Sequence, residues 1–278
     1  MKDHLRQLVS GQANPLLARC LAREYAQARI LQTLQERGAF RCWAFQGGTA
    51  LRFLYGLPRF SEDLDFALER AEAPVAFRDY LKSVAADFAA EGYAVRVTVS
   101  GRKTVRAAFV NLPGLPFELG LSPHRSEVLS VKVKLDARPP AGAGLATSIV
   151  RRHVTLHLQH HDPASLLAGK LHAVLARPWL KGRDVFDLVW YLSDRSWPAP
   201  NLTLLNNALA QTGWGGPALT AHTWRKALAQ KVASADWGGV MRDVRPFLER
   251  EQDADLLTRA NLLKLLAQSQ DGQAGQLK

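Results

Sequence analysis

The chain has 278 residues, of which 47% are hydrophobic and 22% charged, and its formal net charge at pH 7 is +11. This length allows one large domain or two modest ones, each with a proper hydrophobic core. The absence of any run of about 18 apolar residues argues against a membrane span. With no recognisable signal peptide and only two cysteines, Cys20 and Cys42, we expect a cytoplasmic protein.

The positive charge is concentrated in the middle of the chain. Residues 94–183 contain 14 Lys or Arg and four Asp or Glu, whereas the rest of the chain contains 22 and 21. Such a concentration favours a polyanionic partner, with nucleic acid as the first candidate. The alternative is a solvated basic surface that serves solubility alone, and no signature of a known RNA-binding module decides between the two.

Helices and strands alternate in the first part of the chain. A long helical pattern ends at Gly38, a short aromatic strand leads into Gly47, and a helix that begins at Pro74 ends at Gly92. The predicted helices cover 15–37, 49–55 and 74–91, and the predicted strands cover 40–45 and 64–68.

A β-rich region follows, and helical patterns fill the remainder of the chain. The strands are predicted at 93–100, 105–111, 128–136 and 151–158, the last after a loose connection at 139–144. Helices are predicted at 163–177, 183–194, 201–211, 219–233, 236–249 and 253–268, with Asp162 as the N-cap of the first and a frayed tail after the last. We therefore expect an α+β fold, with a mixed sheet and flanking helices in a domain at 1–160 and a helical domain at 161–278.

The most informative stretch is residues 45–66. A Gly47-Gly48-Thr49 turn opens a helix, and Asp63 and Asp65 follow at a strand. Residues two apart on a strand project from one face, and a hard divalent cation commonly relieves the repulsion between two adjacent carboxylates. A glycine turn that offers N–H groups to phosphates, next to a metal-binding pair, is the minimal equipment for nucleotidyl or phosphoryl transfer. The alternative is a solvated strand start, because two aspartates at this spacing are common by chance.

A third carboxylate would complete a two-metal site, and Asp136 is the best candidate. Alternation along the strand at 128–136 places Lys132, Lys134 and Asp136 on one polar face. This face is either the floor of a phosphate site or an exposed sheet surface.

The helical half contains a lysine amid apolar residues, Lys170, and two aspartates on one helical face, Asp184 and Asp187. An unpaired buried lysine would be costly, so one reading is a structural ion pair. The functional reading has Lys170 binding a nucleotide phosphate while the aspartates orient it or bind the base or a metal.

Together these residues resemble the AbiEii/AbiGii toxin family of nucleotidyltransferases, which includes the mycobacterial MenT toxins. The resemblance covers roughly residues 40–195 and depends on the order of four motifs, each of them weak alone. They are Gly47-Gly48-Thr49-Ala50-Leu51, Arg59-Phe60-Ser61-Glu62-Asp63-Leu64-Asp65-Phe66, Lys170-Leu171-His172-Ala173 and Arg183-Asp184-x-x-Asp187-Leu188.

The resemblance implies a DNA-polymerase-β-like nucleotidyltransferase fold with a helical C-terminal portion that completes the active site. It implies a toxin of a two-gene toxin–antitoxin system linked to phage defence, with a cognate antitoxin or regulator as partner. It also implies transfer of NMP from an NTP to RNA, most directly the 3′ acceptor end of tRNA, which would block translation.

The resemblance also assigns roles to individual residues. The nucleotide-binding residues would be Gly47, Gly48, Thr49, Arg59 and Lys170. The catalytic residues would be Asp63, Asp65, Lys170, Asp184 and Asp187, with Mg²⁺ held by Asp63, Asp65 and Asp136. Relatives often carry an acid two residues before the position of Asp136, where this chain has Lys134.

Two alternatives remain open from the sequence. The same fold could modify a protein or small-molecule hydroxyl, although the concentrated positive charge argues against a small acceptor. A non-catalytic nucleotide-binding regulator is the second alternative. The intact Asp63, Asp65 and Lys170 disfavour it.

Overall fold

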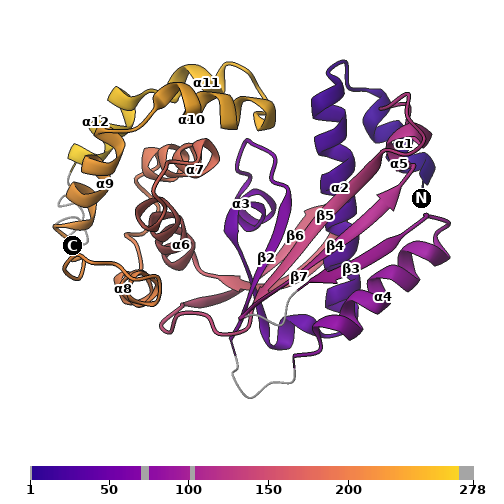
Figure 1. Ribbon diagram of the computed structural model, residues 1–278, viewed down its shortest axis with the longest axis horizontal. Helices are drawn as coiled ribbons and strands as arrows, with labels where there is room; N and C mark the ends of the chain where they lie inside the picture. Colours follow the sequence, from indigo (N-terminus) through magenta and orange to yellow (C-terminus); the bar gives the residue numbers. More distant parts are fainter. Residues whose placement is uncertain (1, 70–74, 101–103, 269–278) are drawn as a thin grey trace, which may run out of the picture. The chain divides into compact units, whose positions relative to one another are not determined.

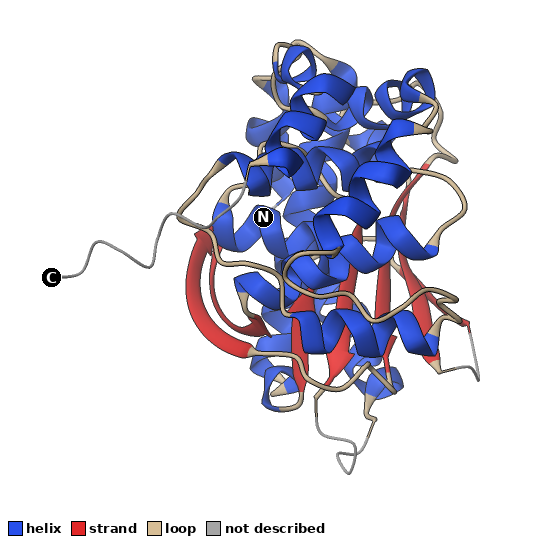
Figure 2. Cartoon of the chain, turned by 90° about the vertical axis from the view of Figure 1, so that its left-hand side faces the viewer, coloured by secondary structure: helices blue, strands red, loops and turns tan. Residues whose placement is uncertain are grey.

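The computed structural model describes residues 2–69, 75–100 and 104–268, and its elements are labelled in Figure 1. The chain forms two compact units. One comprises Met1–Pro139 with Leu145–His161, and the other comprises Pro140–Gly144 with Asp162–Lys278. Every described strand lies in the first unit, drawn red in Figure 2, whereas the described elements of the second are helices. The expected α+β class, with a mixed sheet and flanking helices, is confirmed.

The first unit is built on a seven-stranded sheet with the strand order β3-β4-β5-β2-β1-β7-β6. β2 runs parallel to β5 and β1 runs parallel to β7, while the other neighbours are antiparallel. In chain order the strands are β1 (Trp43–Gln46), β2 (Asp63–Leu68), β3 (Arg96–Ser100), β4 (Val105–Pro113), β5 (Val128–Asp136), β6 (Leu145–Arg152) and β7 (Val154–His161).

One face of the sheet is apolar and packs under helices. On β5 the alternating residues Leu129, Val131, Val133 and Leu135 are buried, and the polar residues between them are only half-buried. The long helix α2 (Pro15–Glu36) contacts β5 and β7, and α4 (Phe77–Ala90) contacts β3 and α2 (Figure 1). The period-two pattern of the strand thus leaves its polar residues on the opposite face.

A short helix, α3 (Gly47–Tyr55), connects β1 to β2 and contacts both strands. It ends at Gly56, whose φ of 72° is the left-handed conformation that terminates many helices. β1 and β2 pair antiparallel with Gln46 opposite Asp65. The start of α3 and the first residues of β2 therefore lie at the same edge of the sheet.

The predicted strand at 151–158 is wrong. Residues 145–161 instead form the hairpin of β6 and β7, with Arg152 paired to Val154 and a turn at His153. His153 has φ 60°, a conformation that glycine or asparagine usually occupies in such turns, so the sequence carries no ordinary turn signal here. The short helices α1 (Lys2–Ser10) and α5 (Leu115–Glu118) and the 3₁₀ turn η1 (Ala39–Arg41) were also not predicted.

The second unit is a cluster of helices in which α7 contacts α6, α10 and α12. The Asp162 side chain accepts a hydrogen bond of 2.7 Å from the Ser165 N–H, which confirms it as the N-cap of the first helix. The elements are α6 (Pro163–Ala176), α7 (Gly182–Ser193), α8 (Leu202–Gln211), α9 (Trp224–Ala233), α10 (Trp237–Val244), η2 (Arg245–Phe247), α11 (Asp253–Leu256) and α12 (Arg259–Ala267).

The last two predicted helices are each divided. The segment 236–249 turns to 3₁₀ geometry at Pro246, which cannot donate a backbone hydrogen bond. The segment 253–268 is interrupted at Leu257, and Thr258 caps a new helix. The predicted frayed tail and the predicted helix start at Pro74 lie outside the described residues. Within the described part of the chain, no helix has the length and apolar character needed to span a membrane.

Candidate active site

The Gly47 turn at the start of α3 lies directly against the carboxylate of Asp65. Gly47 has φ +80°, and a Cβ at this position would lie 2.9 Å from Asp65 Oδ2. Both facts require glycine here, because an L side chain would be strained and would collide with the carboxylate. The turn and the carboxylate on β2 are therefore in contact.

Glycine is also required at position 48, because other side chains lie close to it. A Cβ on Gly48 would lie 2.7 Å from Nη2 of Arg59 and 3.2 Å from Oγ of Ser61. The Arg59 side chain is buried, and its Nη1 donates a hydrogen bond of 2.8 Å to the Phe60 carbonyl oxygen. The guanidinium thus lies beside the first turn of α3, where backbone N–H groups lack intrahelical partners.

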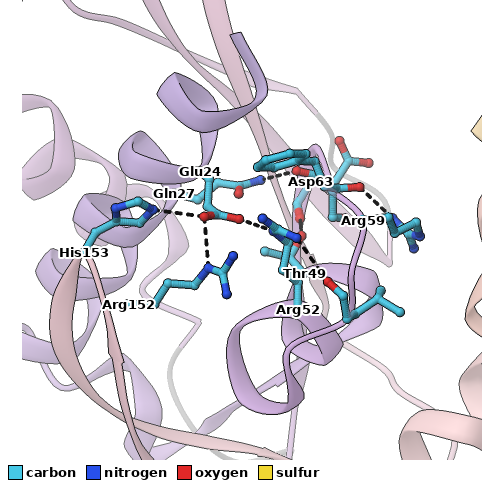
Figure 3. Close-up of polar contacts among 11 residues, drawn as sticks. Glu24, Gln27, Thr49, Arg52, Arg59, Asp63, Arg152 and His153 are labelled. Atoms are coloured by element: carbon cyan, nitrogen blue, oxygen red, sulfur yellow. Dashed lines mark hydrogen bonds and ion pairs between the residues drawn. The ribbon is translucent and has the colours of Figure 1, made fainter. Parts of the chain in front are cut away.

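Thr49 has a structural part in this arrangement. Its side chain is fully buried, and its hydroxyl donates a hydrogen bond to the carbonyl oxygen of Asp63 (Figure 3). This bond ties the first turn of α3 to the start of β2. The carboxylate of Asp63 is left to project from the sheet.

The two carboxylates converge on one ammonium group. Lys134 on β5 forms an ion pair with Asp63 and lies 3.3 Å from Asp65 Oδ1. Burial alone would lower the pKa of Lys134, but the neighbouring Asp65 and Asp63 carboxylates outweigh it and raise that pKa. Each carboxylate side chain remains 33% exposed. The site is thus a partly open pair of carboxylates held together by a positive charge.

This donor set fits a hard divalent cation. Magnesium takes oxygen ligands and is commonly bound by one or two carboxylates together with substrate phosphates. Both carboxylates contact the Lys134 ammonium, so they already converge on one positive charge. Asp63 and Asp65 would therefore be the protein ligands.

Asp136 lies two residues beyond Lys134 on β5. Lys134 is paired in register with Asp65, and Asp136 is paired with Ala67. The Asp136 carboxylate accepts a hydrogen bond of 3.0 Å from the Arg138 N–H. Among the described residues no group of three or more His, Cys, Asp or Glu side chains is placed to hold a metal ion. The role of Asp136 as a third ligand stays a prediction.

A buried cluster of charged residues joins α3 to α2 and to the β6–β7 turn. Glu24 on α2 forms an ion pair with Arg52 on α3 (Figure 3). Glu24 Oε1 also lies 2.9 Å from Arg152 Nε and 3.0 Å from His153 Nε2 at the β6–β7 turn. Burial would raise the pKa of Glu24, but the hydrogen bond to His153 and the charges of both arginines lower it to about 2. The cluster links three elements that are distant in sequence.

The sequence reasoning missed this cluster, although a signal was present. Glu24 and Gln27 fall at helical spacing with Leu31 and Leu34 on the buried face of α2. The Gln27 side-chain amide donates a hydrogen bond of 3.0 Å to the Ser61 carbonyl oxygen. Polar residues in phase with an apolar stripe are the signal for buried polar contacts.

The second unit contains the other predicted site residues. Lys170 on α6 lies 3.0 Å from Asp184 Oδ1 and 2.6 Å from Asp187 Oδ2, both on α7. All three are buried, and Asp184 also forms an ion pair of 2.5 Å with the more exposed Arg177. Asp184 lies in the first turn of α7, where the helix dipole favours a negative charge. The structural ion pair considered from the sequence is thus present.

The start of α7 is fixed by close contact with α10. A Cβ on Gly182 would lie 1.9 Å from the Val240 carbonyl oxygen, so only glycine fits. The Arg183 N–H donates a hydrogen bond of 3.1 Å to Asp243. The helix terminus that carries Asp184 is therefore held rigidly within its own unit.

The predicted site residues thus fall into two groups. In the first unit the structure brings together Gly47, Gly48, Thr49, Arg59, Asp63 and Asp65, and it adds Lys134 to them. In the second unit it brings together Lys170, Asp184 and Asp187.

Comparisons with known proteins agree on the class of protein. A family model described as the nucleotidyl transferase AbiEii toxin of type IV toxin–antitoxin systems matches residues 29–259. A structure from H. pylori assigned as a nucleotidyltransferase is 18% identical with a TM-score of 0.50, and the match covers 89% of this chain and 96% of that one. JHP933 from Helicobacter pylori is 16% identical with a TM-score of 0.50, over 89% and 93%. No curated protein matches the chain significantly.

At these identities the two solved structures show a shared fold. The family match is the stronger finding, because it spans most of the chain and includes the Gly47 turn, the Asp63 and Asp65 pair and the Lys170 cluster. The resemblance drawn from four motifs is confirmed over a longer range. The chain belongs to the AbiEii family of nucleotidyltransferase toxins of type IV toxin–antitoxin systems.

Proposed function

We propose that this toxin transfers NMP from an NTP to the 3′ acceptor end of an RNA, most directly a tRNA, and thereby blocks translation. The observation that carries the proposal is the contact between the Gly47 turn and the Asp65 carboxylate. A phosphate bound at this turn would therefore lie close to a cation bound by the carboxylates. A nucleoside triphosphate needs both at once.

The carboxylates of Asp63 and Asp65 would hold Mg²⁺. When bound, the ion would neutralise charge on the phosphates and lower the pKa of the attacking hydroxyl. Lys134 would balance the charge of the pair when the nucleotide is absent. The ion pair also keeps the two carboxylates close together, and a cation bound by them would take over the contacts that Lys134 makes.

The first turn of α3 would bind the triphosphate. Its backbone N–H groups and the positive end of the helix dipole favour an anion, and the Arg59 guanidinium lies against Gly48. Glycine at both positions lets Asp65 and Arg59 lie directly against this turn. The Glu24 cluster holds α3 in place through Arg52.

The transfer itself would be an in-line displacement. The terminal ribose hydroxyl of the RNA attacks the α-phosphorus, a new P–O bond forms, and the bond to the bridging oxygen breaks. Pyrophosphate leaves, and the hydroxyl proton is released to solvent. Asp63 and Asp65 would orient the reacting groups.

The charge distribution supports RNA as the acceptor. The segment 94–183 carries 14 basic and four acidic residues. A phosphate backbone is the acceptor feature that such a balance attracts, and a small hydroxyl compound would not need it. Binding is therefore expected to weaken as the salt concentration rises.

The experiment is an incubation of the protein with total bacterial tRNA, Mg²⁺ and each of the four α-labelled NTPs in turn. We expect label on tRNA with at least one NTP, and loss of label in the Asp63→Asn variant. The matched control is Asp79→Asn, which makes the same change at an exposed aspartate on α4. Labelling by Asp63→Asn at the wild-type rate would overturn the assignment of the site. Label on protein instead of RNA would move the acceptor to a protein hydroxyl, and nucleotide binding without any transfer would favour the non-catalytic regulator.

A further inference from the structure

The face of the sheet that carries the carboxylates continues well beyond them. Asp63 on β2 is paired in register with Lys132 on β5, Lys132 with Phe109 on β4, and Phe109 with Thr98 on β3. Residues paired directly across strands project from the same face of a sheet. Neighbouring strands are about 4.8 Å apart, so Phe109 lies about 10 Å from Asp63 along this row.

Phe109 is conspicuous because it is an aromatic residue on the open face. It is 38% exposed, whereas its neighbours Ala108 and Val110 on the other face are fully buried. The Lys132 ammonium lies 5.2 Å from the centroid of the ring, within the range of a cation–π contact. The exposed ring therefore has a positive charge beside it.

The next row of the same face is polar and basic. Asn111 is paired with Ser130 on one side and with Arg96 on the other, and the Ser130 hydroxyl donates a hydrogen bond of 2.6 Å to the Asn111 amide oxygen. Arg96 is exposed. The face thus combines an aromatic ring, two cations and hydrogen-bonding side chains, and it has no acidic residue in these two rows beyond Asp63.

The order of the strands determines on which side of the carboxylate pair this surface lies. Along the sheet, Phe109 lies on the β5 side of the carboxylate pair, and the Gly47 turn follows β1 on the opposite side. In an in-line transfer the acceptor and the leaving pyrophosphate lie on opposite sides of the α-phosphorus. If the Gly47 turn binds the phosphates that leave, the Phe109 side is the side of the acceptor.

We propose that this surface, made of Phe109, Lys132, Thr98 and Arg96, binds the unpaired nucleotides at the 3′ end of the RNA acceptor. One base stacks on the Phe109 ring, and Lys132 and Arg96 pair with backbone phosphates. This inference rests on the proposed function, because it assigns the acceptor side of the same site. It predicts single-stranded RNA ends, and not duplex RNA, as the ligand of this face.

The test compares Phe109→Ala, Phe109→Leu and Phe109→Trp. Two quantities are measured for each, the affinity for a short single-stranded RNA oligonucleotide without NTP and the separate KM values for tRNA and NTP. Loss of one stacked base is expected to weaken RNA binding and raise the KM for tRNA about tenfold in the Ala and Leu variants. The Trp variant retains a stacking surface and should stay within about twofold of wild type.

The matched control is Ile149→Ala, which removes a large apolar side chain that is 69% exposed on β6, the strand at the other edge of the sheet. It should leave both quantities unchanged. The proposal is overturned if Phe109→Ala behaves like Ile149→Ala, or if it raises the KM for NTP and not the KM for tRNA. If the wild type labels no RNA at all, the proposed function fails, and the oligonucleotide affinities alone then decide whether the Phe109 surface binds RNA.

Discussion

The carboxylate of Asp65 occupies the space in which a side chain on Gly47 would have to begin. The gap from an added Cβ to Asp65 Oδ2 is 2.9 Å, and the backbone at Gly47 has φ +80°. The turn at the head of α3 and the carboxylate on β2 are therefore a single structural unit. A side chain added at position 47 must displace the Asp65 carboxylate.

The first prediction concerns this contact. Gly47→Ala is expected to reduce nucleotide transfer roughly 100-fold, because displacement of a reacting group by about 1 Å has that effect. It should also cost about 1–2 kcal/mol of unfolding free energy through the positive φ. Transfer to tRNA and urea denaturation measure the two effects.

The control for this variant lies at the other end of the same helix. Gly56 has φ +72°, and a Cβ there would meet no atom within 4 Å. Gly56→Ala should therefore lose similar stability and keep its activity. Equal losses of activity in the two variants would show that backbone strain, and not the contact with Asp65, is responsible.

The second prediction concerns the charge between the carboxylates. Lys134→Met leaves Asp63 and Asp65 without the ammonium that joins them, so their mutual repulsion should lower the melting temperature by about 2–4 °C. Mg²⁺ should restore this loss and raise the melting temperature of the variant more than that of the wild type. Thermal unfolding with and without Mg²⁺ measures both.

The matched variant is Lys82→Met, which removes an exposed lysine from its pair with Asp79. It should melt like the wild type with and without Mg²⁺, since exposed pairs contribute little. If Lys134→Met gains no more from Mg²⁺ than the wild type, the carboxylate pair is not the cation site.

Several features of this site could be predicted from the sequence because they depend on local patterns. The alternation of apolar and polar residues predicts the strand at 128–136 with the bounds that the structure has. The spacing of two residues along a strand predicts that Asp63 and Asp65 lie on one face. The position of Lys134 could not be predicted. It depends on the parallel pairing of β2 with β5, strands separated by four other elements in the chain, and pattern alone does not specify non-local pairing.

The Glu24 cluster was missed for a related reason. Its members come from α2, α3 and a hairpin turn more than 100 residues from Glu24, and the sequence pattern predicts a single strand where the hairpin lies. A turn at His153 with positive φ carries none of the glycine, asparagine or proline signals that mark hairpins. Once the turn was missed, no sequence argument could bring Arg152 to Glu24.

The third prediction uses the pKa of Glu24. That pKa is lowered from 4.5 to about 2 in the folded chain, so the stabilisation is fully present above pH 4.5 and is lost as the pH falls through about 2. The associated loss of unfolding free energy is on the order of 3 kcal/mol. In Glu24→Gln this acid-dependent part should disappear, and stability near neutral pH should fall by about 3 kcal/mol because Arg52 loses its buried partner.

Chemical denaturation at a series of pH values measures this prediction. Glu36→Gln is the control, since Glu36 lies on the same helix and is exposed. An acid-dependent loss of the same size in wild type and Glu24→Gln would mean that other carboxylates account for it.

The fourth prediction separates structure from function at Lys170. Lys170→Met leaves the Asp187 carboxylate, whose side chain is fully buried, without its ion-pair partner at 2.6 Å. The cost should be about 3–5 kcal/mol of unfolding free energy. The double variant Lys170→Met/Asp187→Asn removes the uncompensated charge and should regain at least half of that loss.

Transfer activity of the stabilised double variant then tests the role of Lys170. If Lys170 contributes to triphosphate binding, the KM for NTP should remain raised although the fold is restored. A wild-type KM in the double variant would assign the cluster a structural role alone.

The most direct measurement of the central claim uses two labels in parallel. The protein is incubated with tRNA, Mg²⁺ and the same NTP labelled either at the α-phosphate or at the γ-phosphate. The account predicts that the α-label appears at the 3′ end of the tRNA, that the γ-label leaves with pyrophosphate, and that Asp63→Asn abolishes the first. Appearance of the γ-label on the tRNA, or of neither label while wild-type protein binds the NTP, would contradict it.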